Sequence, residues 1–272
     1  MRMFDADARR RAVATASRGG PKLLSYLLLA FILGPLVIIV SVSLTPEQFL
    51  NFPPRGVSLR WYADLLSTPR WIESMQISLL VALGATVFGT SLGFSLAYIL
   101  DRYDYFWVPA LGAVGILPIL LPPITIGVAF FSFFILIGYT GSIWNLIVAH
   151  SVFFCPMPFI LIYQGLNTID DEYEEAAMNL GATPSYTFRT VTLPIIRTNV
   201  ATGAIFVFIL SLNEYVVAWV LSGSTLQTVP IRIFSSLRYS YSPIIAAVSV
   251  VFICVTFALV IALDYYTGGI WE

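Results

Sequence analysis

Four residues with binding chemistry stand together inside an otherwise apolar stretch: Asn213, Glu214, Tyr215 and Trp219. An acid, an amide and aromatic rings are the groups that hold an organic cation, by charge and by attraction to ring faces. Tyr215 and Trp219 are four residues apart, so both rings can share one helix face. A buried carboxyl group is costly and needs a reason. We predict substrate contact for this group; in the alternative, Glu214 is protonated against a neighbouring helix or hydrated near the end of the segment.

Chemistry of the catalytic kind has little support in the sequence. A phosphate-binding loop needs a Gly-Lys pair, and the one lysine of the chain, Lys22, follows Pro21. The single histidine, His150, lies in an apolar stretch, where we expect a hydrogen bond between helices, with a proton relay as the alternative. Cys155 and Cys254 lack the spacing of a metal site. We therefore expect no catalytic residue, no metal and no cofactor in this chain.

The elements that carry these residues must lie in a lipid bilayer. Of 272 residues, 58% are apolar and 11% are charged, and the mean hydropathy is +0.86, far from the range of soluble domains. About 20 apolar residues cross a bilayer, and charged residues mark the ends of each crossing. Charge-free intervals predict four spans, at 23–46, 74–100, 105–137 and 143–169, and two further apolar runs, at 199–222 and 243–263, make six. The near-zero net charge gives no support to nucleic-acid binding.

Arginines near the start of the chain indicate its orientation. The first 22 residues contain six basic side chains: Arg2, Arg9, Arg10, Arg11, Arg18 and Lys22. The positive-inside rule places this arm in the cytoplasm, and six spans return the other end to the same side. We therefore expect a cytoplasmic arm over 1–22, a six-helix membrane domain over 23–266 and a cytoplasmic tail over 267–272. The loop at 167–198 is then cytoplasmic, whereas 44–71 and 223–242 are external.

Prolines and glycines inside the spans predict how the helices bend and pack. Pro118, Pro122 and Pro123 remove amide donors from the third span, so they predict either a broken helix beside a pathway or a kink. The same choice applies to the prolines at 156 and 158 in the fourth span. Small residues permit close approach of helices, and we expect packing at three glycines: Gly84, Gly89 and Gly93.

The loop between the fourth and fifth spans predicts a short amphipathic helix, roughly Asp171 to Leu180. Capable N-caps precede it, acidic residues suit the positive end of its dipole, and Gly181 ends it. Apolar residues recur at helical spacing and form one stripe: Ile169, Tyr173, Ala176 and Leu180. The acids Asp171, Glu172, Glu174 and Glu175 are expected on the remaining surface. A second short helix is expected to begin at Thr183 and Pro184 and to end at Pro194.

This acidic helix is unsuited to lying on lipid. Helices that lie on the cytoplasmic surface carry Lys and Arg, because the headgroups there are anionic. A protein partner explains the helix better, and the small side chains of Ala176 and Ala177 would allow close approach. The alternative is a solvated connecting loop that caps the bundle.

The same segment resembles the signature of importer-type ATP-binding-cassette permeases. That motif runs acid-Ala-Ala, three residues, Gly, nine residues, an aliphatic residue, one residue and Leu-Pro. Here it is matched by Glu175-Ala176-Ala177, Gly181, Val191 and Leu193-Pro194, with Val191 where Ile is usual. Further stretches are similar to spermidine/putrescine-type permeases: 53–66, 213–219, 227–238 and 242–249.

The resemblance implies a fold, partners and a role. It implies six transmembrane helices in the importer-type permease fold, with 171–180 as a coupling helix that sits in a groove of a cytoplasmic ATPase. The residues implied at that contact are Glu174, Glu175, Ala176, Ala177, Gly181 and Pro194. The implied partners are a second permease chain, two ATPase subunits that bind ATP and magnesium, and a periplasmic or lipid-anchored solute-binding protein. The implied location is the bacterial inner membrane, with lipid around the spans.

The cargo implied by the resemblance is a polyamine or related organic cation. Polyamine-type permeases usually carry acids at both positions that match Asn213 and Glu214, so Asn213 removes one negative charge. An amino-acid derivative, a zwitterion or an oxyanion therefore remains open. From the residues alone, an ion-coupled secondary transporter or channel and an integral-membrane enzyme or scaffold are the other classes. A secondary transporter would show inverted repeats and buried ion-binding acids, and only one intramembrane acid is found.

Overall fold

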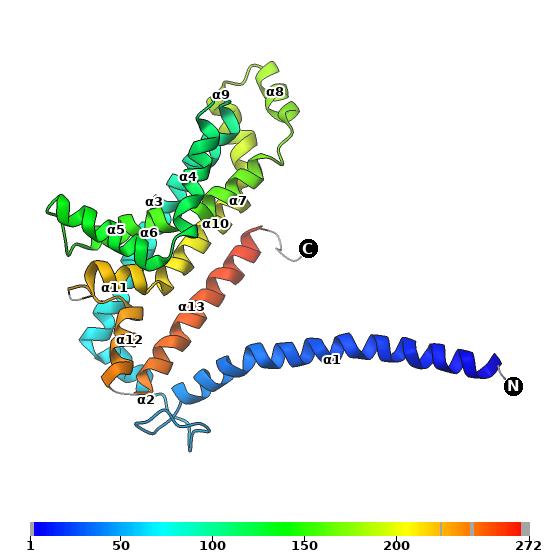
Figure 1. Cartoon of the computed structure of the whole chain (residues 1–272), viewed down its shortest axis with the longest axis vertical. Helices are drawn as coiled ribbons and strands as arrows, with labels where there is room; N and C mark the ends of the chain where they lie inside the picture. Colours follow the sequence, from blue (N-terminus) through cyan, green and yellow to red (C-terminus); the bar gives the residue numbers. More distant parts are fainter. Residues whose placement is uncertain (1–2, 224, 240–241, 268–272) are drawn as a thin grey trace. The chain divides into compact units, whose positions relative to one another are not determined.

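A computed structural model describes residues 3–223, 225–239 and 242–267, and these parts are built of helices (Figure 1). In chain order the helices are α1 (Met3–Ser43), α2 (Arg60–Ser67), α3 (Pro69–Arg102), α4 (Val108–Leu120), α5 (Pro123–Leu136), α6 (Ile143–Phe154), α7 (Pro156–Leu166), α8 (Asp171–Asn179), α9 (Pro184–Thr187), the π-helical turn η1 (Phe188–Thr192), α10 (Leu193–Asn213), α11 (Val216–Ser222), α12 (Val229–Tyr239) and α13 (Ile244–Thr267). The all-α prediction is confirmed. Of the predicted tail, 268–272 lie outside the described residues.

Six crossings are accounted for in the described residues when bent pairs are taken as one span each. Four helices are long and apolar enough to span a bilayer: 21–43, 69–102, 184–213 and 244–262. Two pairs pass the same test together, α4 with α5 and α6 with α7. The fold of an all-α membrane protein follows, since helices satisfy their own backbone groups in lipid. Helix α1 is continuous across the predicted boundary between arm and first span at residue 22.

The prolines bend the third and fourth spans by very different angles. Between α4 and α5 the chain direction bends by 108°, with Pro122 at the N-cap of α5 and Pro123 in its first turn. Between α6 and α7 it bends by only 42°, at Pro156. The gap between the predicted third and fourth spans, at 138–142, is also confirmed, because helix α5 ends at Leu136 and α6 begins at Ile143. In this gap Gly138 and Gly141 have φ of 70° and 75°, which favours glycine.

Contacts divide the chain into two compact units. One contains the chain up to Leu65 together with a stretch that ends at Val251, and the other contains the rest. In the first, the loop after α1 is fixed to α2, because the indole of Trp61 donates to the Thr45 carbonyl at 2.8 Å. In the same unit, the hydroxyls of Ser43 and Tyr62 are 2.8 Å apart.

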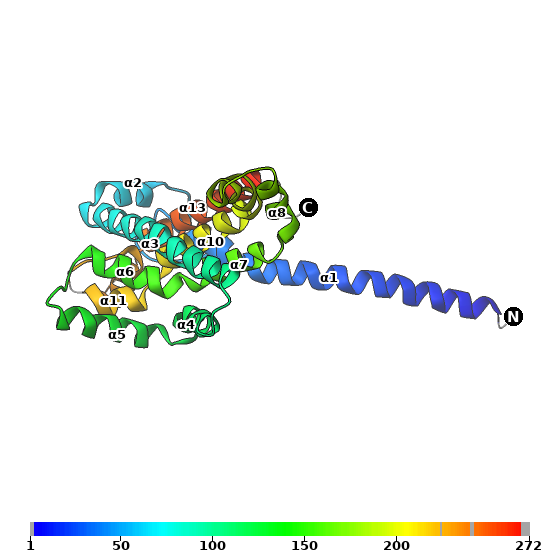
Figure 2. The same cartoon turned by 90° about the horizontal axis from the view of Figure 1, so that it is seen from above.

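Helix α3 is the centre of the larger unit. It packs against α6, α7 and α10, and α5 lies beside α6 and α11 (Figure 2). A Cβ on Gly93 would lie 2.7 Å from the Phe159 nitrogen, and one on Gly84 would lie 2.8 Å from the Ile147 side chain. The predicted role of these glycines in close packing is confirmed. The main apolar core lies between these helices: Val81, Leu146, Phe153, Val207 and Val217 are among its buried members.

Opposite ends of α3 receive different parts of the chain. Near its start, Ser74 accepts from the Arg232 side chain at 2.5 Å, and Ser78 accepts from the Val229 amide at 2.8 Å. Near its end lie α8 and α9, whereas α11 and α12 are at the other end (Figure 1). The helices of the predicted cytoplasmic loop 167–198 that Figure 1 labels α8 and α9 therefore lie at one end of the unit, and α12, which belongs to the predicted external segment, lies at the other.

Candidate functional site

Helix α8 is a short helix of nine residues whose ends are both set by local sequence. Its N-cap is Asp170, whose carboxylate accepts from the Glu172 amide at 3.3 Å. At the other end Gly181 has φ of 92°, and the amides of Gly181 and Ala182 reach back to the carbonyls of Met178 and Ala177. This is the Schellman arrangement that glycine permits. The predicted helix and its end at Gly181 are confirmed, and Asp170 is its N-cap.

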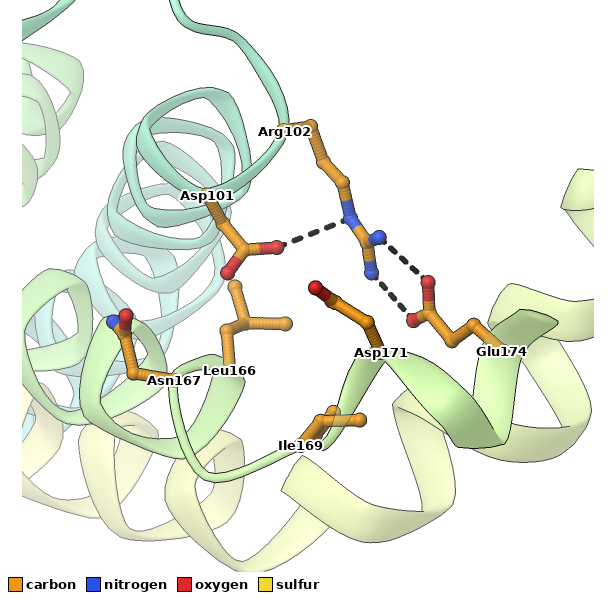
Figure 3. A pocket seen from close by; sticks show the side chains of 7 residues that line it. All are labelled: Asp101, Arg102, Leu166, Asn167, Ile169, Asp171 and Glu174. Carbon is orange, nitrogen blue, oxygen red and sulfur yellow. Dashed lines mark hydrogen bonds and ion pairs between the residues drawn. The ribbon is translucent and has the colours of Figure 1, made fainter.

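Glu174 turns inward from α8 and binds the end of α3 (Figure 3). Both terminal nitrogens of Arg102 donate to its two carboxylate oxygens at 2.5 Å. The hydroxyl of Thr192 in η1 donates to Oε1, also at 2.5 Å. The remaining nitrogen of the guanidinium, Nε, lies 3.0 Å from the carboxylate of Asp101. One arginine therefore holds acids from two helices that are far apart in sequence.

The environment of Glu174 stabilises its charged form. Its side chain is 11% exposed, so a lone carboxylate there would be penalised. The hydrogen bond from Arg102 lowers the pKa of Glu174, the Thr192 hydroxyl acts in the same direction, and burial opposes both. A cavity of about 330 Å³ adjoins the pair, and its lining residues are Asp101, Arg102, Leu166, Asn167, Ile169, Asp171 and Glu174 (Figure 3).

The prediction that Glu174 faces outward with the other acids of α8 is wrong. A sequence pattern assigns it to the polar face, but the pairing with Arg102 draws it into the protein. Glu175 and Ala176 do lie on the exposed side, and Ala177 is half-buried. The predicted apolar stripe is exposed beyond Ile169: Tyr173 is 63% exposed and Leu180 is 90% exposed. Ile169 instead packs beside the buried cluster that contains Leu166.

The prediction that Pro194 ends a second short helix is also wrong. Helix α9 begins as expected, with Thr183 at its N-cap, but it continues through η1 into α10. Pro194 falls in the first turn of α10, where the missing amide is tolerated. The π-helical turn just before it closes with a bond from the Leu193 amide to the Phe188 carbonyl, which widens the helix there. The predicted fifth span, 199–222, therefore starts earlier and ends at Asn213.

The helix break at Glu214 is the second candidate region. Glu214 is extended between α10 and α11, and its carboxylate accepts from the amides of Val217 and Ala218 at 2.8 and 2.9 Å. The same carboxylate lies 3.5 Å from Nε2 of His150 in α6, and the two side chains are 7% and 1% exposed. The other ring nitrogen of His150 lies 2.8 Å from the Ser211 hydroxyl in α10. The expected hydrogen bond between helices at His150 is confirmed.

The other three residues predicted for the substrate pathway point in different directions. Asn213 is exposed, and its amide donates to the Ile209 carbonyl of its own helix at 2.8 Å. Trp219 is 51% exposed. The ring of Tyr215 packs on Phe234 of α12, with centroids 4.6 Å apart. Glu214 faces the protein interior and Tyr215 packs against the main apolar core, whereas Asn213 and Trp219 are exposed, so the four side chains do not converge in this conformation.

Arg102 and Thr192 have no sequence signal that assigns them to Glu174, because the three residues lie in separate segments. One feature of the sequence does indicate that Arg102 could lie near this loop. It stands beside Asp101 at the end of a charge-free span, at the same predicted membrane face as the 167–198 loop. The partners of Glu214 were equally hidden. His150 was recognised as a buried polar residue, but its pairing with a carboxylate 64 positions away depends on how α6 packs beside the helix break.

Three curated relatives match most of the chain. The spermidine/putrescine transport system permease protein PotC of Haemophilus influenzae is 28% identical, over 87% of this chain and 91% of its own length. The putrescine transport system permease protein PotI of Escherichia coli is 30% identical, over 80% of each. The putative 2-aminoethylphosphonate transport system permease protein PhnV of Salmonella typhimurium is 26% identical, over 88% of this chain and 91% of its own length.

Solved structures share the fold at low identity. A bacterial ABC transporter involved in the import of the acidic polysaccharide alginate has a chain that aligns with a TM-score of 0.69 at 17% identity, covering 90% of this chain and 94% of its own. The inward-facing MetNI methionine ABC transporter aligns with a TM-score of 0.61 at 18% identity, covering 72% of this chain and 93% of its own.

The family assignment rests on a match that includes both candidate regions. Residues 85–269 match the model of the family described as "Binding-protein-dependent transport system inner membrane component". The matched range contains Arg102, all of α8 and the helix break at Glu214. The chain therefore belongs to this family, as the permease subunit of a binding-protein-dependent ABC importer.

Proposed function

We propose that this permease imports a polyamine or a closely related organic amine, with energy from ATP that is hydrolysed in a separate subunit docked on α8. The observation that carries the docking is the exposed face of α8. Tyr173, Met178 and Leu180 are 63%, 42% and 90% exposed on a helix that also carries outward acids. Anionic lipid headgroups repel such a helix, so a protein groove is its better partner.

The sequence shows no phosphate-binding loop that could hold ATP. Its one lysine is Lys22, and no Gly-Lys pair of a phosphate-binding loop occurs in the sequence. The signature around Glu175 and Gly181 supports an ATPase as the partner, and Pro194 belongs to the same signature. By this proposal the ATP and magnesium sites lie in two cytoplasmic ATPase subunits, and a second permease chain completes the membrane pathway.

Charge and relatives together support an amine as cargo. PotC and PotI are named for spermidine and putrescine, and they match this chain over most of its length. Glu214 supplies a carboxylate at a helix break inside the bundle, beside the exposed Asn213 and Trp219. A conformational change that frees Glu214 from His150 would present this charge to a cation. Such a cation favours whichever state offers it the carboxylate, and it shifts the equilibrium by that preference.

The relative PhnV supports a second candidate cargo. Its name assigns it to 2-aminoethylphosphonate, a molecule with an amine at one end and an anionic group at the other. Asn213 stands where a second acid is usual in the polyamine type, so the site carries one negative charge rather than two. One carboxylate is enough for the single amine of a zwitterion.

The proposed arrangement also fixes the topology. Helix α8 must lie on the cytoplasmic side to meet an ATPase, and so must the Arg102 end of α3. The first 22 residues and the end of the chain then face the cytoplasm, while a periplasmic or lipid-anchored binding protein delivers cargo from the other side. The six basic residues of the arm support the same orientation.

The cargo is tested by rebuilding the importer in lipid vesicles with the ATPase and the binding protein of the same transport system. Spermidine, putrescine, 2-aminoethylphosphonate and glycine betaine are each loaded on the binding protein, and ATP hydrolysis and uptake of the labelled solute are measured. Stimulation by spermidine or putrescine is expected. Stimulation by 2-aminoethylphosphonate alone would assign the second cargo, and none by any amine would refute the proposal.

The docking is tested on the exposed stripe of α8. Replacing Tyr173 and Leu180 together by serine removes apolar surface from the outer face and leaves Glu174 in place. The ATPase should no longer co-purify with this double variant. The matched control replaces Leu117 and Leu120, which are exposed in the membrane-spanning α4, by alanine. Retention of the ATPase by the α8 variant would place docking elsewhere.

A further inference from the structure

Arg102 joins three segments that are distant in the chain. Its guanidinium comes from the last residue of α3, binds both carboxylate oxygens of Glu174 in α8, and through that carboxylate reaches Thr192 in η1. Asp101 takes the remaining Nε contact, and the ring of Tyr98 lies 5.7 Å below the guanidinium. Each nitrogen of the guanidinium therefore has a carboxylate partner (Figure 3).

The geometry of this contact makes it resistant to displacement. A bidentate arginine–carboxylate pair fixes the orientation of both groups as well as their distance. The side chain of Glu174 is 11% exposed and that of Arg102 is 29% exposed, so water competes less than at an open surface. The loops on either side of α8, at 167–170 and 180–183, are bends of a few residues, and they are less suited to carry force.

The α3 end of the contact is part of a closely packed bundle. Helix α3 packs against α6, α7 and α10 along its length. At Gly93, nine residues before Arg102, its backbone is so close to α7 that a Cβ would lie 2.8 Å from the Cys155 carbonyl oxygen. Dense packing transmits displacement, so movement of the end of α3 reaches the other helices.

We propose that Arg102 is the positioning residue that transmits movement of α8 to the membrane helices, by coupling Glu174 to the end of α3. This inference rests on the proposed docking of an ATPase on α8. The ATPase moves the outer face of the helix, and the inward face carries the movement through the ion pair into α3. The Thr192 hydroxyl directs the same movement into η1 and α10.

The test compares Arg102→Ala, Arg102→Lys and the exchange Arg102→Glu with Glu174→Arg in the rebuilt importer. Arg102→Ala should retain the ATPase but raise the ATP hydrolysed per solute imported by about five-fold or more. Arg102→Lys keeps the charge but loses the two-pronged geometry, so it should be intermediate. The exchange restores opposite charges and should recover part of the coupling. Such a recovery would not occur if the single variants acted only through a general loss of stability.

Two variants at the same membrane face serve as controls. Asp104→Asn removes one negative charge from the exposed loop after α3, outside the proposed docking face, and Arg189→Ala removes one arginine from the exposed side of η1. Both should keep the wild-type ratio of ATP to solute. An Arg102→Ala complex that assembles and also keeps this ratio would overturn the inference while leaving the docking intact.

A second measurement needs no ATPase. Spin labels at Asp104 and Asn179, both exposed, report the separation of the α3 end from α8 in a chain whose exposed cysteine, Cys254, is replaced by serine. The distance distribution should be narrow in the wild type and in Glu172→Gln, and broad in Arg102→Ala. Equal distributions in all three would overturn the inference. Failure of the wild-type chain to bind an ATPase would instead contradict the proposed function, and the transmission role with it.

Discussion

The carboxylate of Glu214 lies 3.5 Å from Nε2 of His150 in a part of the bundle where both side chains are almost wholly buried. The carboxylate also accepts from two backbone amides at the start of α11, and the imidazole also meets the Ser211 hydroxyl in α10. The pair therefore ties α6 to both sides of the helix break. A helix interrupted inside a membrane needs such partners, because lipid offers none to freed polar groups.

Replacing His150 by alanine should loosen this region. The change leaves the Ser211 hydroxyl and one side of the Glu214 carboxylate without their partner, at an expected cost of about 1–3 kcal/mol. The purified protein should lose its monodisperse form in detergent at a lower temperature than the wild type. Asn213→Ala is the control, because Asn213 is exposed and bonds only to its own helix. A His150→Ala protein as heat-resistant as this control would show that the pair is dispensable for stability.

Glu214→Gln tests the proposed role of the charge in transport. Glutamine keeps the size of the side chain and one acceptor oxygen for the α11 amides, but it removes the negative charge. If an amine contacts this carboxylate during import, uptake should fall about ten-fold, equivalent to about 1.4 kcal/mol, while the complex still assembles. Uptake and co-purification are measured on the same preparation. Unchanged uptake would count against contact with the cargo.

Gly181 allows a test of backbone conformation alone. Its φ of 92° is in the range that side chains disfavour, yet a Cβ there would meet no atom within 4 Å. Gly181→Val should therefore strain the end of α8 by about 1–2 kcal/mol without any clash, and it should raise ATP use relative to uptake. Gly181→Asn should be milder, since asparagine tolerates this region better than other side chains. Coupling is measured as the ratio of ATP hydrolysis to uptake. A wild-type ratio in both variants would exclude a role for the conformation of Gly181.

Local features of the sequence were enough to predict α8 and the interruptions at prolines in the third and fourth spans, but not the helix break at Glu214. Asp170 caps α8 and Gly181 ends it through contacts within a few residues, and prolines act on the turn that precedes them. The inward orientation of Glu174 could not be predicted from the sequence, because it depends on the packing that brings Arg102 near. The wrong prediction at Pro194 has a related cause. A proline predicts the end of a helix unless the preceding turn is known to be π-helical, and that turn has no sequence signature of its own.

Gly93 should be the least replaceable of the small residues in α3. A Cβ there would lie 2.7 and 2.8 Å from backbone atoms of α7, which cannot rotate away as a side chain can. Gly93→Ala should force α3 and α7 apart and lower stability by about 1–3 kcal/mol. Gly34→Ala in α1 is the matched control, since a Cβ there meets nothing within 4 Å. Detergent-solubilised protein is heated and the folded fraction is followed, and similar melting of both variants would contradict the close approach.

The lowered pKa of Glu174 predicts how acid affects the contact with Arg102. Because the folded-state pKa lies below the ordinary glutamate value, the stabilisation is fully present above that ordinary value and is lost as pH falls through the lowered one. Spin labels at Asp104 and Asn179 should therefore keep a narrow distance distribution from neutral pH into mild acid, and the distribution should broaden only in stronger acid. Glu174→Gln should be broad throughout, because a neutral amide cannot replace the paired carboxylate. Circular dichroism at each pH verifies that the helices persist. Broadening at mildly acidic pH, well above the ordinary glutamate pKa, would mean that another group controls the separation of α8 from α3.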